Sequence, residues 1–304
     1  MQKAIKKKST LIKDTPADKI FMVLVYLFLT LSLLVVLLPL LHVIAASFSD
    51  PGAVIAGEVF IWPVRPTLRG YEAVFKNPKI ISGFANSFFY MIVGTAVNIA
   101  MTLLCAYPLS RREFRARNVL SGLIVFTMYF SGGLVPTYMV VNKLGLIDTR
   151  AVMIIPVALS VWNVIICRTF MSSTIPDALY EAASLDGCTP IGFLWRIVIP
   201  LSGPIIAVLV LYYGVGHWNT YFNAMIYLKS NNLMPLQIVL REILVLNKID
   251  PAMMADVDAM LAKQGLTDLL KYSVIVVASV PVMLIYPFVQ KYFVQGVMIG
   301  AIKG

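Results

Sequence analysis

Long apolar runs alternate with shorter polar connectors along most of the chain. An α-helix needs roughly 20 mostly apolar residues to cross the hydrocarbon layer of a membrane. The chain contains six runs of about that length, at residues 20–46, 84–108, 119–141, 151–170, 204–228 and 272–293. The pattern predicts an all-α polytopic membrane protein with six transmembrane helices and both termini on one side.

A basic segment, residues 1–19, precedes the first apolar run. This order is also typical of a cleaved signal peptide, whose apolar core has roughly 7 to 15 residues. The run at residues 20–46 is much longer than such a core. We therefore predict a basic cytoplasmic N-terminus, 1–19, and a single transmembrane domain, 20–304, whose first helix stays in the mature protein.

Composition indicates that lipid is the main solvent. Apolar residues make up 59% of the 304 residues and charged residues 13%, about half the usual charged share of soluble domains. The net charge of +10 lies in the connectors, without a basic stripe interleaved with aromatic residues, so we expect no nucleic-acid partner. The three cysteines (Cys105, Cys167 and Cys188) and two histidines have no metal-ligand spacing, so we expect no metal site.

Lysine and arginine indicate the orientation. With the N-terminus inside, the inner segments hold 14 of these residues and the outer ones 11. The long outer connectors at residues 47–82 and 229–271 dilute the bias, whereas residues 1–19 and 109–118 are basic and lie beside spans. Segments close to spans carry most of the positive-inside signal. We therefore predict cytoplasmic N- and C-termini, with residues 171–200 in the cytoplasm as well.

Residues 176–204 combine acidic residues, turn residues and amphipathic spacing between two predicted spans. Pro176 is typical of a first helical turn, and Gly187 allows the left-handed turn that ends a helix. Thr189 and Pro190 are typical of the start of a second short helix. The stretch is too polar to span the membrane and too apolar for a solvated loop.

Such a helix pair could lie on lipid or dock against a protein. Helices that lie on lipid usually carry lysine or arginine on their polar face. The first helix here carries Asp177, Glu181 and Asp186 and no basic residue, which favours a protein partner.

This stretch resembles the EAA motif of the permease subunits of binding-protein-dependent ABC importers. The resemblance extends to the spacing before an Ile-x-x-Pro element and to the position between the fourth and fifth spans. The matching residues are Glu181, Ala182, Ala183, Asp186, Gly187, Phe193, Ile197, Pro200 and Pro204. Cys188 stands where the family usually has alanine, which is also small.

The resemblance implies that residues around 176–187 form a coupling helix that docks into a cleft of a separate ATPase. The implied ATPase-coupling residues are Glu181, Ala182, Ala183, Asp186, Gly187 and Pro200. Glu181 offers a charge, and the two alanines permit close approach. The implied partners are a second homologous permease subunit (a heterodimer), two ATPase subunits and an extracellular solute-binding protein, in the plasma membrane of a bacterium.

Within this superfamily the chain resembles the carbohydrate group, nearest to the polysaccharide and lipo-oligosaccharide permeases of Gram-positive bacteria. Trp218-Asn219 and the C-terminal Gly300-Ala301-Ile302-Lys303-Gly304 carry that likeness. It implies the transmembrane subunit of an ATP-driven sugar or oligosaccharide importer, with Lys303 and its neighbours reaching toward the ATPases. The acidic outer connector (Asp250, Asp256, Asp258 and Asp268) faces either the binding protein or solvent.

The chain contains no G-x-x-x-x-G-K-[ST] sequence, the loop that cradles nucleotide phosphates. Gly132-Gly133 lies in an apolar run and lacks the lysine that such a loop needs. We therefore expect no enzyme activity and no cofactor on this chain, with ATP and Mg²⁺ used by the partner ATPase.

Polar and aromatic residues within the fifth span predict a substrate pathway, because such residues inside a membrane mark pathways by default. Aromatic faces and amide or hydroxyl groups are also what a sugar needs. The candidates are Tyr212, Tyr213, His217, Trp218, Asn219, Tyr221 and Asn223, with Met128, Tyr129 and Tyr138 near the third span. An interfacial aromatic belt and helix packing are the alternative explanation.

Other functions are less well supported. An ion-coupled secondary transporter needs a membrane-embedded carboxylate, and the predicted spans contain no aspartate or glutamate. An intramembrane enzyme needs a catalytic constellation, such as H-E-x-x-H, that the sequence lacks. Import of a non-sugar solute by the same machinery is opposed only by the weaker C-terminal and Trp218-Asn219 motifs.

Overall fold

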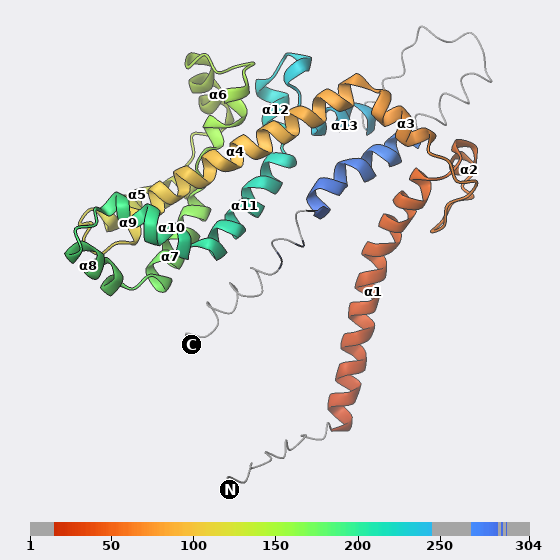
Figure 1. Ribbon diagram of the computed structural model, residues 1–304. Helices are drawn as coiled ribbons and strands as arrows, with labels where there is room; N and C mark the ends of the chain where they lie inside the picture. Colours follow the sequence, from red (N-terminus) through yellow and green to blue (C-terminus); the bar gives the residue numbers. More distant parts are fainter. Residues whose placement is uncertain (1–14, 245–268, 285–286, 288–289, 291–304) are drawn as a thin grey trace. The chain divides into compact units, whose positions relative to one another are not determined.

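The computed structural model describes residues 15–244, 269–284, 287 and 290 (Figure 1). All regular elements in these residues are helices, which confirms the predicted all-α class. The chain divides into two compact units, Met1–Gly70 with Asp258–Ser273, and Tyr71–Val257 with Val274–Gly304. The predicted N-terminal segment, the acidic outer connector and the C-terminal Gly300–Gly304 motif lie almost entirely outside the described residues.

The first unit contains α1 (Pro16–Ser47) and α2 (Pro51–Ile55). A capping box fixes the start of α1, because the Thr15 side chain accepts from the Asp18 N–H and the Asp18 carboxylate accepts from the Thr15 N–H. The most apolar part of α1 is not buried by the described residues of its own unit. A helix that is apolar all round and uncovered is suited to lipid or to another subunit.

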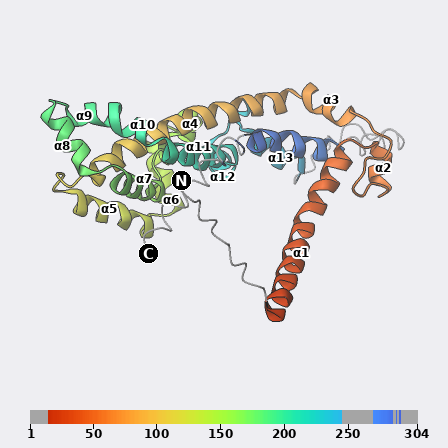
Figure 2. The same cartoon turned by 60° about the horizontal axis from the view of Figure 1, so that its bottom comes forward.

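The second unit is built around α4 (Pro78–Ser110), which packs against α7 (Val161–Thr174), α11 (Gly203–Trp218) and α13 (Leu236–Leu244). Figures 1 and 2 show α11 running alongside α4. The amide of Asn86 donates to the carbonyls of Asn232 and Met234 at 2.8 and 3.1 Å. Asn86 therefore finds its partners inside the protein, as an apolar surrounding requires.

Several predicted spans are bent. The third one consists of α5 (Arg117–Tyr129) and α6 (Leu134–Lys143), which meet at 113°. The fourth joins the 3₁₀ turns of Arg150–Val157 to α7 at 52°. The chain changes direction at residues 130–133, where Gly133 has a φ of +81°, so the predicted span at residues 119–141 is interrupted at Ser131-Gly132-Gly133.

The remaining elements continue the bent spans or join them. They are α3 (Arg69–Lys76), α8 (Asp177–Leu185), α9 (Pro190–Phe193), α10 (Ile199–Leu201), α12 (Phe222–Tyr227), the 3₁₀ turn Asn231–Leu233 and the apolar helix Leu269–Leu284. Two described helices are long and apolar enough to cross a membrane, and up to five spans result if each bent pair counts as one. The six-span count stays a prediction.

Asp148 joins two connectors on the predicted outer side. It has a φ of +58°, and its carboxylate accepts from the N–H groups of Lys229 and Ser230, both at 2.8 Å, and from the Ser230 hydroxyl at 2.5 Å. These hydrogen bonds, led by that of the Ser230 hydroxyl, lower the pKa of the Asp148 carboxyl below its ordinary value. The charged form is therefore the one that the fold stabilises.

We predict that Asp148→Asn lowers the melting temperature of the detergent-solubilised protein at neutral pH. Because the folded pKa is lowered, the carboxylate contributes stability above its ordinary pKa of about 3.9 and loses that contribution as the pH falls through the folded value. The difference in melting temperature between wild type and variant should therefore shrink below about pH 4. A difference that is constant between pH 7 and about pH 3 would contradict this account.

Candidate functional site

The stretch that resembles the EAA motif forms a helix, a glycine turn and a second helix. The first helix is α8, with Asp177 in its first turn. It ends in a Schellman motif, in which the N–H of Cys188 donates to the Ala183 carbonyl and the N–H of Gly187 donates to the Ser184 carbonyl. Gly187 has a φ of +77°, so this turn requires the conformational freedom of glycine.

The second helix begins at α9. The Thr189 hydroxyl accepts from the Gly192 N–H at 3.1 Å, and Pro190 occupies the first turn, as the sequence predicts. A π turn, Leu194–Val198, follows and leads into α10, which contains Pro200. A wider turn suits this position, because a proline clashes with the carbonyl four residues before it. The run Pro190–Leu201 then meets α11 at 81°.

One side of this loop is fixed to the body of the second unit. Ala183 and Phe193 are buried in a core formed with residues of α4, α7 and α11. The Tyr180 ring meets Phe193 edge-on at 5.2 Å, and the Tyr107 hydroxyl of α4 donates to the Pro190 carbonyl at 2.9 Å. These contacts make the loop a rigid extension of the helices rather than a free connector.

The other side of the loop is exposed. Glu181, Ala182, Asp186 and Gly187 are all exposed, and Leu185 keeps 90% of its surface accessible. We expected both alanines to face a partner. Ala183 instead packs into the chain's own core at 8% exposure, because its position on the helix faces residues of α4, α7 and α11.

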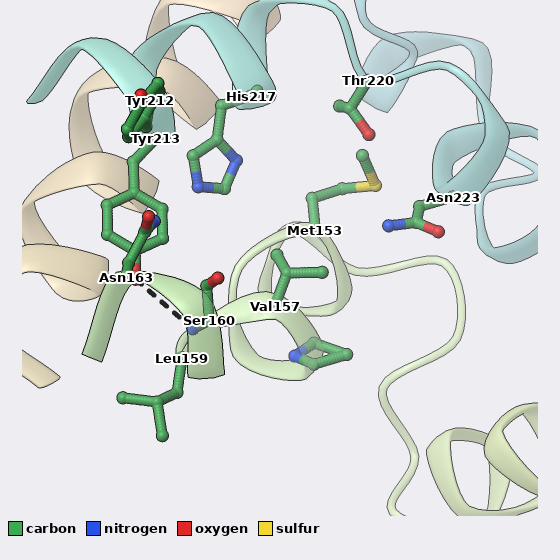
Figure 3. Close-up of a pocket in the computed structure, with 12 residues that line it drawn as sticks. Met153, Val157, Leu159, Ser160, Asn163, Tyr212, Tyr213, His217, Thr220 and Asn223 are labelled. Atoms are coloured by element: carbon green, nitrogen blue, oxygen red, sulfur yellow. Dashed lines mark hydrogen bonds between the residues drawn. The ribbon is translucent and has the colours of Figure 1, made fainter. Parts of the chain in front are cut away.

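A second candidate site is a cavity of about 520 Å³ beside α11. Figure 3 shows Tyr213 and His217 of α11 facing the segment that joins the 3₁₀ turns to α7, and Tyr212 also lines the cavity. The complete lining is Met153, Pro156, Val157, Leu159, Ser160, Asn163, Tyr212, Tyr213, Gly216, His217, Thr220 and Asn223. Of the sequence candidates, Tyr212, Tyr213, His217 and Asn223 are brought together here.

Hydrogen bonds across helices hold two of these side chains in place. The Tyr213 hydroxyl lies 2.7 Å from the Thr102 hydroxyl of α4 and accepts from the Ser160 N–H at 3.3 Å. His217 Nε2 lies 2.6 Å from the Asn98 side-chain oxygen, also on α4. The cavity wall on α11 is therefore positioned by α4.

The other sequence candidates lie elsewhere. Trp218 is 1% exposed and its indole N–H donates to the Ala278 carbonyl at 3.1 Å. With Asn219 it lines a separate cavity of about 340 Å³. Tyr221 and Tyr129 are exposed, at 48% and 72%, and line neither cavity. The predicted cluster on the fifth span is thus divided between two faces of the helix.

The sequence interpretation missed several polar residues of the main cavity. Ser160, Asn163 and Thr220 line it, and Asn98 and Thr102 support its wall. Ser160 and Asn163 are three residues apart in an apolar segment, a spacing that places them on one helical face. That spacing was the signal that could have identified them.

The helices and the two sites together define a membrane-embedded transporter subunit. Residues 98–299 match the family described as binding-protein-dependent transport system inner membrane component. The chain is 41% identical to Protein LplC of Bacillus subtilis (strain 168), over 96% of this chain and 97% of that one. It therefore belongs to this family and is a permease subunit of an ABC importer.

Two further relatives are named for sugar transport. The polygalacturonan/rhamnogalacturonan transport system permease protein YtcP of Bacillus subtilis (strain 168) is 40% identical over 94% of this chain and 99% of its own. A chain in the crystal structure of a bacterial ABC transporter involved in the import of the acidic polysaccharide alginate is 31% identical, with a TM-score of 0.87. That likeness covers 92% of this chain and 99% of the solved one.

We predict that Gly94→Ala disturbs the main cavity from behind. A Cβ atom at Gly94 would lie 2.4 Å from His217 Nε2, so the imidazole must move and lose its bond to Asn98. Overpacking of this kind costs about 1–3 kcal/mol, which should appear as a lower melting temperature. Gly216→Ala is the matched control, because nothing lies within 4 Å of its added Cβ. Equal melting temperatures for the two variants would contradict the prediction.

Proposed function

We propose that this chain forms half of the translocation pathway for an oligosaccharide that an extracellular binding protein delivers. A second, homologous permease subunit supplies the other half. Two separate ATPase subunits bind and hydrolyse ATP with Mg²⁺ on the cytoplasmic side, and this chain has no enzymatic step of its own. It crosses the bacterial membrane six times, with both termini in the cytoplasm and the loop of residues 171–200 facing the ATPases.

The two-sided loop is the observation that carries this proposal. Its inner side, including Ala183 and Phe193, is part of the core of the unit, whereas its outer side presents Leu185 between acidic residues. An exposed leucine next to Glu181 and Asp186 fits a protein cleft better than an anionic lipid surface. Because the loop is rigidly attached, movement of the ATPases displaces the transmembrane helices as a body.

The coupling roles follow from where each residue lies. Glu181 and Asp186 are exposed charges for the cleft, and Ala182 is the exposed small residue that allows close approach. Gly187 makes the turn at the end of α8, and Pro200 lies where the loop returns to the fifth span. Ala183 contributes by packing the loop onto the core. The C-terminal tail is a further candidate contact with the ATPases.

The main cavity supports a carbohydrate as the substrate. It presents two tyrosine rings together with hydroxyl, imidazole and amide groups, and its volume lies within the usual range for small-molecule sites. Sugars need this mixture of flat apolar faces and hydrogen-bonding groups. The names of YtcP and of the alginate importer support the same substrate class. We assign the pathway to Tyr213, His217 and Asn223.

Reconstitution of the whole complex tests the substrate class. Proteoliposomes that contain this chain, its partner permease and the ATPase subunits should accumulate oligogalacturonides only with the binding protein outside and ATP inside. Uptake without ATP would favour a secondary transporter. ATP-driven uptake of a peptide or of phosphate, with no uptake of any oligosaccharide, would contradict the carbohydrate assignment and leave the importer assignment intact.

We predict that Leu185→Asp separates the permease from its ATPase. Leu185 makes few contacts in this chain, being 90% exposed, so the folding free energy should change by less than about 0.5 kcal/mol. At the centre of an interface the same change should weaken ATPase co-purification at least tenfold, or about 1.4 kcal/mol. Leu144→Asp is the control, because Leu144 is also exposed (66%) but lies on the predicted outer side. Wild-type assembly of Leu185→Asp would contradict the docking role.

A further inference from the structure

Arg111 is a buried arginine at the junction of α4 and the loop. It follows the last residue of α4 and is only 5% exposed. None of its three guanidinium nitrogens has a hydrogen-bond partner among the described residues. Buried arginines are normally paired, because an enclosed charge without a partner is costly. The position of Arg111 therefore needs an explanation.

The guanidinium does not cap its own helix. A helix ends with four carbonyls that lack a partner within the helix. Here the Ser110 hydroxyl, the Arg111 N–H, the Arg168 Nε–H and the Ser172 hydroxyl satisfy the carbonyls of four successive residues. The acceptors are Tyr107, Pro108, Leu109 and Ser110, in that order.

The guanidinium contacts two aromatic rings instead. Its central carbon lies 5.7 Å from the centre of the Tyr107 ring on α4 and 5.6 Å from that of Phe193 in the loop. Both distances are within the range of a cation–π contact. The Tyr107 hydroxyl also donates to the Pro190 carbonyl at 2.9 Å. Arg111 thus connects α4 to the second half of the loop.

Stability alone does not account for an arginine here. Replacing a buried charged group by a well-packed apolar side chain is often neutral or stabilising. What arginine adds is a planar cation that contacts two rings on different elements and fixes their relative position. Phe193 is 0% exposed, so it cannot shift without disturbing that contact.

We propose that Arg111 is the positioning residue that transmits displacement of the coupling loop to α4. This inference rests on the proposed coupling function of the loop. When the ATPases move the loop, Phe193 carries Arg111 and Tyr107 with it, and these belong to α4 or its end. The same helix holds Asn98 and Thr102, which position His217 and Tyr213 of the cavity. The Arg111 contact, together with the Tyr107–Pro190 hydrogen bond, thereby joins the ATPase side of the chain to its cavity.

The test uses Arg111→Met and Arg111→Lys in the assembled complex. Methionine fills the site without a charge, and lysine restores the charge without the planar group. We expect Arg111→Met to assemble with the ATPases and to melt at the same or a higher temperature. We then measure ATP hydrolysis in the presence of binding protein that carries oligogalacturonides. The rate with Arg111→Met should be at least about fivefold below that of wild type, which is the low end of coupling between sites. Lysine should recover part of that loss. The exposed Arg115 supplies the control, Arg115→Met, with wild-type hydrolysis.

Hydrogen exchange provides a measurement that does not depend on transport. With Arg111→Met, backbone amides of residues 188–198 should exchange about fivefold faster, because two ring contacts are lost. If loaded binding protein does not stimulate ATP hydrolysis by the wild-type complex, the proposed function is refuted. Hydrogen exchange in Arg111→Met would still decide the role of Arg111. Unchanged exchange, or wild-type stimulation in Arg111→Met, would overturn the positioning role. So would a lower melting temperature with failed assembly, which indicates a merely structural residue.

Discussion

Four polar side chains on α4 find their partners inside the protein, since hydrocarbon offers none: Asn86, Asn98, Thr102 and Tyr107. This constraint links the parts of the second unit. At one end of α4, Asn86 binds the backbone of the outer connector. In the middle, Asn98 and Thr102 bind the cavity residues of α11. At the other end, Tyr107 binds the loop at residues 176–204, through the Pro190 carbonyl. A single helix thus connects the connector that follows residue 228, the cavity and the loop at residues 176–204.

The local structure of the loop at residues 176–204 could be predicted from its residues. Gly187 adopts the expected left-handed turn, and Thr189 caps the second helix. Each of these outcomes depends on a backbone preference of one residue type, which acts over a few neighbours. Local chemistry therefore determines these features. The starts of α1 and α4 were not predicted: Thr15 and Asn77 cap helices that begin at Pro16 and Pro78, before the predicted spans at residues 20 and 84.

Features that depend on distant partners could not be predicted in the same way. Residues of α4 and α7 determine which side of α8 is buried. Ala183 lies on that buried side, whereas we expected it on the side that faces a partner. Glycines at residues 132 and 133 permit a break in the third span, but they do not specify its angle of 113°. Trp218 and His217 point to different faces of α11 because of helical geometry. The sequence does not show that a cavity lies on each of these faces, since the cavities are formed with residues of other elements.

The central claim is that the exposed side of the loop is cytoplasmic and covered by an ATPase. Labelling of Leu185→Cys with a membrane-impermeant maleimide tests it most directly. Cys188 is replaced by serine in this variant, and the Cys188→Ser protein without Leu185→Cys gives the background labelling. The account predicts labelling in inside-out vesicles, none in sealed right-side-out vesicles, and protection when the ATPase subunits are bound. Labelling from the outer side, or equal labelling with and without the ATPases, would contradict it.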